Sequence, residues 1–423
     1  MKKVLQIRQE SKCEAGQIEH VAEGMSAGAI DTRVELIQAL IPLGLMAVEE
    51  LLAAEVTALA GERYQRQEGR ERVRWGRQRG SVYLADQKLA VPVPRVREQQ
   101  GKREVRLASY QRLQQPRAAD EGLLRRVLLG LSCRRYEECA TLAPQAFGLS
   151  PSSVSRRYLQ ASQRHLQALC ERRLEDYDIV AIFLDGKSFA AEEMVIALGI
   201  TLTGEKVILG FAQTATENER ACRGLLNDLL ERGLHIEHGV LCVIDGSKGL
   251  RAAVRTVFGE QARVQRCQWH KRENVVSYLA NSQQGHFRGK LQAAYAQPTY
   301  ERAKAALERV RRELTLVNES AVRSLDEGLD ETLTLHRLGV FLELAVSFKT
   351  TNCLEAINAQ VAQRIRRVSR WHNSNQKQRW LACALLDIEP RLRKVKGYRY
   401  LPKLRAALQI DLGIADTARA KAA

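Results

Sequence analysis

Two apolar stretches of the same design stand near the middle of the chain. Residues 179–184 are uncharged and mostly large or β-branched, and they end abruptly at Asp185 and a glycine; residues 240–244 repeat the pattern and end at Asp245 and a glycine. An apolar run of this length that stops at a turn signal is typical of a strand buried on both faces. A carboxylate at the end of such a strand is held rigidly and points out of the core. The pattern therefore predicts two buried strands that together supply a carboxylate site.

A hairpin and a helix separate these stretches. Apolar runs at residues 194–201 and 206–213 are joined by Thr203-Gly204, a hairpin signal, and apolar residues three and four apart then predict a helix over 222–230. Residues 264–267 add a further strand. Three antiparallel strands, a helix and then parallel strands is the order of a ribonuclease-H-like core. The predicted fold class is therefore α/β, with a ribonuclease-H-like core.

Helical patterns fill most of the remaining chain. An apolar stripe predicts a helix over residues 33–61 that is interrupted near Pro42. Residues 121–170 are also helical, and residues 278–345 show no strand signal, so we interpret the latter as an all-helical insertion into the core. Apolar residues in steps of three and four predict a basic helix with one buried face over residues 352–369.

The charge of the chain points to a polyanionic partner. Lysine and arginine outnumber aspartate and glutamate by 66 to 49, a formal net charge of +17. Residues 63–106 carry 13 basic and 5 acidic side chains, and residues 361–406 carry 13 and 2. Two such blocks concentrate electrostatic potential, so they favour nucleic acid as the partner over a merely solvated surface.

A short basic ribbon lies inside the first block. Residues 81–84 and 89–97 predict two strands, and Pro92 and Pro94 make the second an edge strand. The ribbon fits a phosphate backbone as well as it fits a charged edge that prevents aggregation.

Residues 147–158 have the sequence pattern of a helix-turn-helix, with a glycine turn, a serine N-cap and Pro151 at the first helical position. The alternative is an ordinary capped pair of helices. The side chains offered to phosphates and base edges would be Ser152, Ser153, Ser155, Arg156 and Arg157.

These patterns divide the chain into six segments. They are an N-terminal helical or mobile segment (1–60), a mainly helical DNA-binding region with the ribbon and the helix-turn-helix (61–175), the first part of the core (176–277), the helical insertion (278–345), the final part of the core with its basic helices (346–410) and a tail (411–423).

Nine cysteines are spread singly along the chain, without a CxxC pair. Isolated cysteines, several in apolar runs, indicate core thiols and a reducing compartment. No window of about 18 apolar residues occurs, and no apolar region follows Lys2 and Lys3. We therefore expect a cytoplasmic protein with no membrane partner.

Asp185 and Asp245 have the chemistry that phosphodiester cleavage requires. Mg²⁺ prefers hard oxygen ligands, and two ions held by a carboxylate cluster can activate the attacking oxygen and stabilise the leaving one. The glycine after each aspartate would leave room for a phosphate; ordinary Asp-Gly turns are the alternative. We expect Glu355 to be the third carboxylate, although Asn352 and Glu355 also fit a capping box. Glu343 is the fallback candidate.

The helix that carries Glu355 continues into a basic group expected to hold the DNA backbone, with Arg366 on the same helical face as Glu355. The group is Arg364, Arg366, Arg367 and Arg370.

Cys267-Gln268-Trp269-His270 invites a zinc interpretation, but one Cys and one His are only half of a structural site. A packing motif at a helix start is favoured instead. Trp269 could stack on a flipped base or belong to the core.

Together these residues resemble the Mutator-like transposases of bacterial insertion sequences, the IS256 family. The resemblance rests on the Asp185 and Asp245 strands, on Cys267-x-x-His270 before a helical insertion, and on Thr351-Asn352-x-x-Glu355. It implies that Asp185, Asp245 and Glu355 form a DDE triad and that Cys267 and His270 are a family signature.

The resemblance implies a nucleoid-associated DDE transposase that binds terminal inverted repeats and catalyses Mg²⁺-dependent DNA cleavage and strand transfer. Mn²⁺ is an expected substitute, and a homodimer or larger homo-oligomer on double-stranded DNA is expected because two ends must be joined. The alternatives are a DNA-binding regulator without catalysis and a ribonuclease-H-like nuclease that hydrolyses without joining.

Overall fold

The computed structural model describes residues 30–65, 69, 71–84, 87–100, 103–115, 117–136, 149–189, 192–214, 219–368 and 370–414. The predictions for residues 1–29, for the tail after residue 414 and for the first helix and turn of the helix-turn-helix lie outside these residues. The chain divides into two compact units, residues 1–161 (unit 1) and 162–423 (unit 2). The segment boundaries predicted from the sequence stay predictions.

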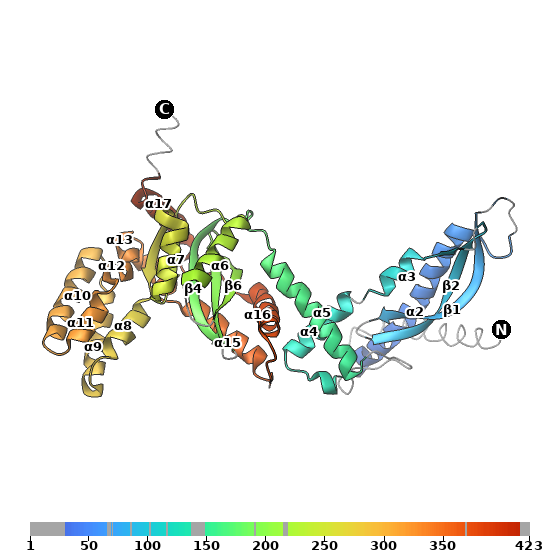
Figure 1. The fold of residues 1–423 in the computed structure, drawn as a ribbon, viewed down its shortest axis with the longest axis horizontal. Helices are drawn as coiled ribbons and strands as arrows, with labels where there is room; N and C mark the ends of the chain where they lie inside the picture. Colours follow the sequence, from blue (N-terminus) through green and yellow to red (C-terminus); the bar gives the residue numbers. More distant parts are fainter. Residues whose placement is uncertain are drawn as a thin grey trace, which may run out of the picture. The chain divides into compact units, whose positions relative to one another are not determined.

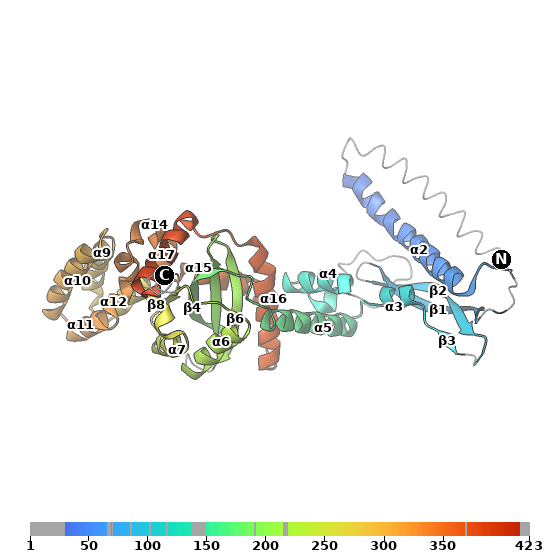
Figure 2. The same ribbon diagram turned by 90° about the horizontal axis from the view of Figure 1, so that it is seen from above.

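Unit 1 combines a long helix with a three-stranded sheet of order β1-β2-β3. In Figure 2, α2 lies along the β1–β2 ribbon, and its buried face packs Leu52 and Val56 against Val82 and Val91. The elements are α2 (Ile30–Ala60), β1 (Arg72–Leu84), β2 (Gln87–Glu98), β3 (Glu104–Val105), α3 (Ala108–Leu113), α4 (Arg117–Leu128), the turn η2 (Cys133–Arg135) and the first part of α5 (Pro151–Cys170).

Two predictions for unit 1 are wrong. Helix α2 is not interrupted near Pro42 but is one continuous helix; a proline removes a single donor and does not end a helix that packing holds further along. Strand β2 is the middle strand and not an edge, because it pairs with both neighbours. Its pairing with β3 is limited to Val96 and Arg97, so the half that carries Pro92 and Pro94 has β1 alone beside it.

Unit 2 is built on a five-stranded mixed sheet of order β6-β5-β4-β7-β8. The first three strands are antiparallel neighbours, β7 runs parallel to β4, and β8 runs parallel to β7. The α/β class and the predicted succession of strands are confirmed. The strands are β4 (Ile179–Phe189), β5 (Glu192–Thr201), β6 (Lys206–Thr214), β7 (Val240–Ile244) and β8 (Ala262–Arg266).

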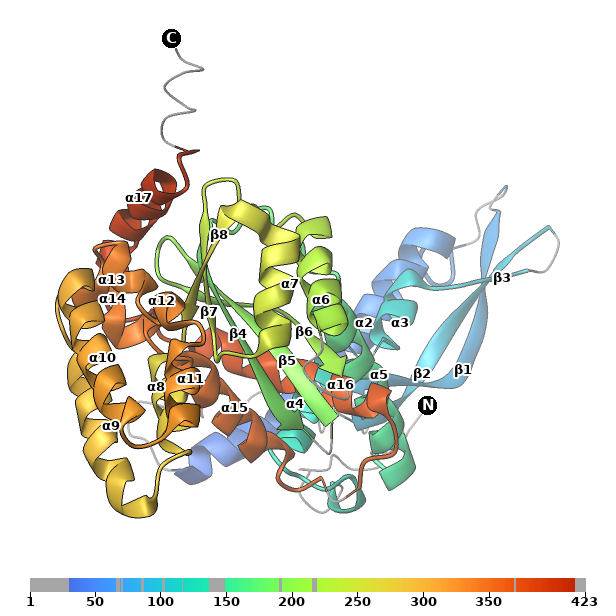
Figure 3. The ribbon, with the colours of Figure 1, turned by 60° about the vertical axis from the view of Figure 1, so that its left-hand side comes forward.

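Helices cover both faces of this sheet (Figure 3). On one face, α6 (Glu219–Glu231) and α7 (Lys248–Phe258) bury their leucines against the strands, in a core that includes Leu184 and Ile244. On the other face, α15 (Asn352–Ile365) packs against β4. The ring of Phe348, at the end of α14 (Phe341–Phe348), stacks on Phe183 with the centroids 5.5 Å apart.

The predicted helical insertion is confirmed in its secondary structure, since residues 278–345 contain helices and turns but no strand. In Figure 1 helices α8 to α13 gather on one side of unit 2, and α12 and α13 contact β8. These helices are α8 (Gln268–Val276), α9 (Asn281–Tyr295), α10 (Tyr300–Thr315), α11 (Glu319–Asp326), α12 (Leu329–Thr332) and α13 (Thr334–Arg337). The remaining elements are η4 (Gly259–Gln261), α16 (Ser374–Ile388), η5 (Glu389–Arg391), η6 (Tyr398–Tyr400) and α17 (Leu401–Asp411).

The predicted basic helix ends earlier than expected. It stops at Ile365 instead of near residue 369, and Arg366 is its C-cap. Beyond Ile365 the apolar repeat offers one half-buried valine, Val368, which is too little packing to hold a further turn. Arg366 itself still has helical backbone angles (φ −51°, ψ −31°), so its place on the helical face of Glu355 stays a prediction.

Within the described part of the chain, no helix combines the length and apolar character that crossing a bilayer requires.

Candidate active site

Asp185 and Asp245 lie next to each other on neighbouring strands of unit 2. Leu184 of β4 pairs with Ile244 of β7 in parallel register, so the two aspartates are the residues that follow this pair. Neighbouring strands are about 4.8 Å apart, and matched positions of parallel strands point to the same face. Leu184 and Ile244 point into the core under α6 and α7, so both carboxylates belong to the opposite face, where α15 lies.

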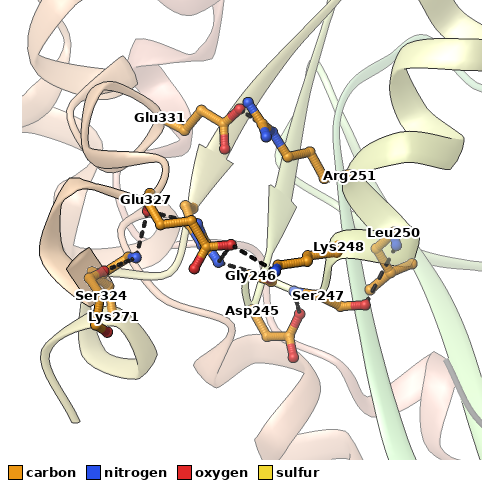
Figure 4. A network of polar contacts seen from close by, with 11 residues as sticks. Asp245, Gly246, Ser247, Lys248, Leu250, Arg251, Lys271, Ser324, Glu327 and Glu331 are labelled. Atoms are coloured by element: carbon orange, nitrogen blue, oxygen red, sulfur yellow. Dashed lines mark hydrogen bonds and ion pairs between the residues drawn. The ribbon is translucent and has the colours of Figure 1, made fainter. Parts of the chain in front are cut away.

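Asp245 begins a tight turn into α7 (Figure 4). Its Oδ1 accepts a hydrogen bond from the backbone N–H of Ser247 at 2.9 Å. Ser247 in turn caps α7, because its Oγ accepts from the backbone N–H of Leu250 at 3.4 Å. The N-terminus of α7 therefore lies close to the carboxylate, where the helix dipole favours negative charge.

Arg266, the last residue of β8, holds this turn from the adjacent strand. It is 5% exposed, and its guanidinium donates to the carbonyl of Gly246 at 2.6 Å and to that of Glu327 at 2.8 Å. Gly246 and Gly328 have φ of +121° and +67°, and a Cβ on either would overlap this guanidinium. The glycine after Asp245 thus makes room for Arg266, and the predicted room for a phosphate at this position is wrong.

The helical insertion supplies Ser324, Glu327 and Glu331 as further contacts around the turn that follows Asp245 (Figure 4). Lys248 and Arg251 of α7 form ion pairs with Glu327 and Glu331, at 3.9 and 2.5 Å. Lys271 of α8 is buried and donates to the carbonyls of Ser324 and Glu327. Burial lowers the pKa of Lys271 to about 8.

Sequence reasoning missed Arg266 and Lys271. The available signal was two basic residues that flank the Cys-x-x-His motif directly after a strand.

Cys267 is the N-cap of α8. Its Sγ accepts from the backbone N–H of His270 at 3.5 Å, which confirms the helix-start interpretation. The adjacent Cys267 sulfur raises the pKa of His270 to about 9 against the effect of burial, and the charges of Asp185 and Asp245 add to the rise. The imidazole therefore lies within electrostatic reach of both aspartates.

Trp269 is not a core residue. It is 45% exposed, and its ring meets the His270 ring edge-on with the centroids 4.8 Å apart. This exposed indole beside His270 is available to a ligand.

Glu355 lies in the first turn of α15, on the helix that packs against β4. The capping-box alternative is wrong, because Asn352 is already inside the helix and the N-cap, Thr351, makes no side-chain cap bond. The Glu355 side chain is exposed and has no hydrogen-bonding or ionic partner among the described residues. The fallback candidate, Glu343, is paired with Lys403 at 2.6 Å.

The two aspartates suit Mg²⁺, because they present hard oxygen donors on one face of a rigid sheet. No three His, Cys, Asp or Glu side chains in the described residues are grouped closely enough to hold a metal ion. The role of Glu355 as the third ligand therefore stays a prediction.

Comparison with known proteins places the chain in a family. The family model for "Transposase, Mutator family" matches residues 8–392. The chain belongs to the Mutator family of transposases. The resemblance predicted from the sequence is thereby confirmed.

Several insertion-sequence transposases are similar to this Mutator-family chain. It is 28% identical to the IS905 transposase of Lactococcus lactis subsp. lactis (strain IL1403), over 56% of this chain and 61% of that relative. It is 24% identical to the IS256 transposase in transposon Tn4001 of Staphylococcus aureus, over 78% and 84%. It is 28% identical to the IS406 transposase of Burkholderia multivorans (strain ATCC 17616 / 249), over 81% and 88%. The matched region thus spans less than two thirds of the IS905 relative.

Two of the arginines predicted to contact DNA are not on the surface of this Mutator-family protein. Arg157 is 7% exposed, and its guanidinium lies over the ring of Tyr83 at 5.3 Å. Arg364 forms an ion pair with Asp387 at 2.8 Å, with both side chains less than a tenth exposed. Both arginines are structural, which corrects the prediction for them.

The other predicted DNA contacts remain accessible. In α5, Ser153 is half-buried and the others are exposed: Ser152, Ser155 and Arg156. After α15, three arginines are exposed: Arg366, Arg367 and Arg370. Their contact with DNA stays a prediction.

Proposed function

We propose that the chain is a DDE transposase and that unit 2 is a ribonuclease-H-like catalytic core. It would bind the terminal inverted repeats of an insertion sequence and catalyse Mg²⁺-dependent strand cleavage and strand transfer. The observation that carries the proposal is the parallel pairing of β4 and β7, which sets Asp185 beside Asp245 in a chain of a transposase family. The strand order β6-β5-β4-β7-β8 supports the fold assignment.

In this proposal Asp185 and Asp245 hold the metal and Glu355 completes the ligand set. Bound Mg²⁺, or Mn²⁺ in its place, supplies activation of the attacking oxygen and stabilisation of the leaving oxygen. The protein supplies the rest. The paired strands hold the two like-charged carboxylates together, Trp269 offers a ring on which a base can stack, and Arg366 and Arg370 bind phosphates.

The β1 strand supports DNA binding by unit 1. It is the outer strand of its sheet, and residues 75–79, Trp-Gly-Arg-Gln-Arg, are all exposed. Arg97 of β2 lies over the Trp75 ring at 4.4 Å. An exposed row of guanidinium and indole groups fits a phosphate backbone and favours the DNA interpretation of the ribbon. Because two DNA ends must be joined, a homodimer or larger assembly on DNA is part of the proposal.

The test is a cleavage and joining assay on labelled duplex that carries the repeats flanking the gene. Wild type and Asp245→Asn are compared with Mg²⁺, with Mn²⁺ and with chelator. Metal-dependent joined products that disappear in the variant, while the duplex is still bound, support the proposal. Binding without any cut in either metal supports a regulator instead, and cuts without joining support a nuclease.

A further inference from the structure

We infer that the junction of residues 266–268 positions both arms of the candidate active site, which are the turn at Asp245 (the Asp245 arm) and the first turn of α15 with Glu355 (the Glu355 arm). In this inference Cys267 is a positioning residue: its backbone is bonded to the Asp245 strand, and its thiol is bonded to the start of the Glu355 helix. The inference rests on the proposed function for what the site does. It assigns a structural task to the Cys-x-x-His motif.

The junction holds the backbone on both sides of Asp245. The N–H of Cys267 donates to the carbonyl of Ile244 at 2.7 Å. The guanidinium of Arg266 donates to the carbonyl of Gly246 at 2.6 Å. The carbonyls of the residues before and after Asp245 thus accept from Cys267 and Arg266, two consecutive residues at the end of β8.

The same junction holds the approach to Glu355. The N–H of Gln268 donates to the carbonyl of Lys349 at 2.9 Å. Thr351, which is fully buried, donates from its Oγ1 to the Sγ of Cys267 at 3.9 Å. The carbonyl of Thr351 then accepts the backbone N–H of Glu355 at 3.2 Å. The first turn of α15 is therefore linked to the junction through Thr351 and Lys349.

The Cys267 thiol is the side chain that joins the two helix starts. It is fully buried, and its sulfur accepts from His270 at the start of α8 and from Thr351 at the start of α15. The Asp245 arm is held by bonds that do not involve the sulfur. Removal of the thiol should therefore loosen the Glu355 arm and leave the Asp245 arm in place.

The test uses Cys267→Ala, Cys267→Ser and Thr351→Val, with Cys242→Ala as the matched control. Cys242 is equally buried, but it lies in the core on the opposite face of the sheet. We expect Cys267→Ala and Thr351→Val each to slow metal-dependent cleavage roughly 10–100-fold, with unchanged DNA binding. Their effects should not multiply in the double variant. Cys267→Ser keeps a polar acceptor at the N-cap and should recover part of the loss.

Hydrogen–deuterium exchange gives a readout that does not need activity. Amides of residues 352–356 should exchange faster in Cys267→Ala and Thr351→Val than in wild type, while those of residues 244–248 should exchange at their wild-type rates. Cys242→Ala should change neither segment. If Cys267→Ala matches Cys242→Ala in exchange and in rate, the inference is overturned. If wild type does not cleave at all, the proposed function fails, and the exchange result alone decides the inference.

Discussion

Asp245 and Glu355 approach the candidate site from two differently built arms. Asp245 follows a buried strand, its carboxylate accepts a backbone hydrogen bond, and the carbonyls on both sides of it are bonded. Glu355 starts a helix with no side-chain cap, and its carboxylate is exposed without a partner. The carboxylate of the first arm is fixed before any ligand arrives, whereas the carboxylate of the second arm is free in solvent although the helix that carries it is packed.

The difference shows how such a site can tolerate its own charge. Two carboxylates side by side repel each other, and rigid strands overcome that repulsion. A third carboxylate that stays in solvent adds little repulsion. In this account it joins the pair only when a cation is bound. We therefore expect substitutions in the two arms to separate into those that affect stability and those that affect activity.

The largest expected effect is the loss of strand cleavage in the variants Asp185→Asn and Asp245→Asn. Each removes a charged oxygen donor from the fixed pair, so strand cleavage should fall by about 10⁴-fold. Gel-shift affinity for the repeat duplex should stay within about twofold, because neither residue is basic. The rates are measured in single-turnover assays, and residual activity within tenfold of wild type would contradict the assignment of the pair.

Substitution of Arg266 should mainly change stability. Arg266→Met removes the donor to the Gly246 carbonyl and leaves the Glu327 carbonyl bonded to Lys271 alone, which should lower the unfolding free energy by about 3 kcal/mol. Arg251→Met, in the more exposed pair with Glu331, should lower it by less than about 1 kcal/mol. Urea denaturation measures both. Equal losses in the two variants would show that Arg266 does not hold the Asp245 turn.

Substitution of Glu355 should mainly change activity and leave stability nearly unchanged. Glu355→Gln removes a carboxylate that bonds to nothing in the described residues, so the unfolding free energy should stay within about 0.5 kcal/mol of wild type. Cleavage should still fall by about 100-fold, because the proposed metal site loses a ligand. A variant with full cleavage activity would remove Glu355 from the site.

The smallest expected effects concern the arginines after α15. Arg366→Ala and Arg370→Ala should each reduce the slope of log affinity against log salt by about 1, because each removes one phosphate contact. Arg364→Ala is the matched control. It should leave the slope unchanged and lower the unfolding free energy by about 3 kcal/mol, since it breaks the buried pair with Asp387. A slope that changes only in Arg364→Ala would reverse the assignment.

The sequence was sufficient to predict the fixed arm. Short apolar runs indicate buried strands, and the residue after each run falls at the strand end. Asp185 and Asp245 could therefore be predicted as a pair without knowledge of the strand register. The third carboxylate could be named but not placed. Asn352 and Glu355 have capping-box spacing, and only the helix start at Asn352 excludes that alternative.

The sequence failed where a side chain's partner is remote. Arg364 and Arg366 look alike in a basic run, and only the packing of α15 on α16 shows that Asp387 neutralises the first. The sequence pattern predicts an exposed Arg157, but its guanidinium lies over the ring of Tyr83, which belongs to the much earlier strand β1. The glycine after Asp245 looked like space for a ligand, and a guanidinium from the adjacent strand lies there instead.

The measurement that tests the central claim most directly is metal-directed backbone cleavage. Fe²⁺ is bound in place of Mg²⁺, and added hydrogen peroxide and ascorbate generate hydroxyl radicals at the bound ion that cut the nearby polypeptide. The fragments are mapped by mass spectrometry. The account predicts cuts next to Asp185 and Asp245, with weaker cuts near Glu355, all suppressed by excess Mg²⁺ and absent in Asp245→Asn. Cuts elsewhere in the chain, or cuts at these places that persist in Asp245→Asn, would contradict the claim that this pair of strand ends holds the metal.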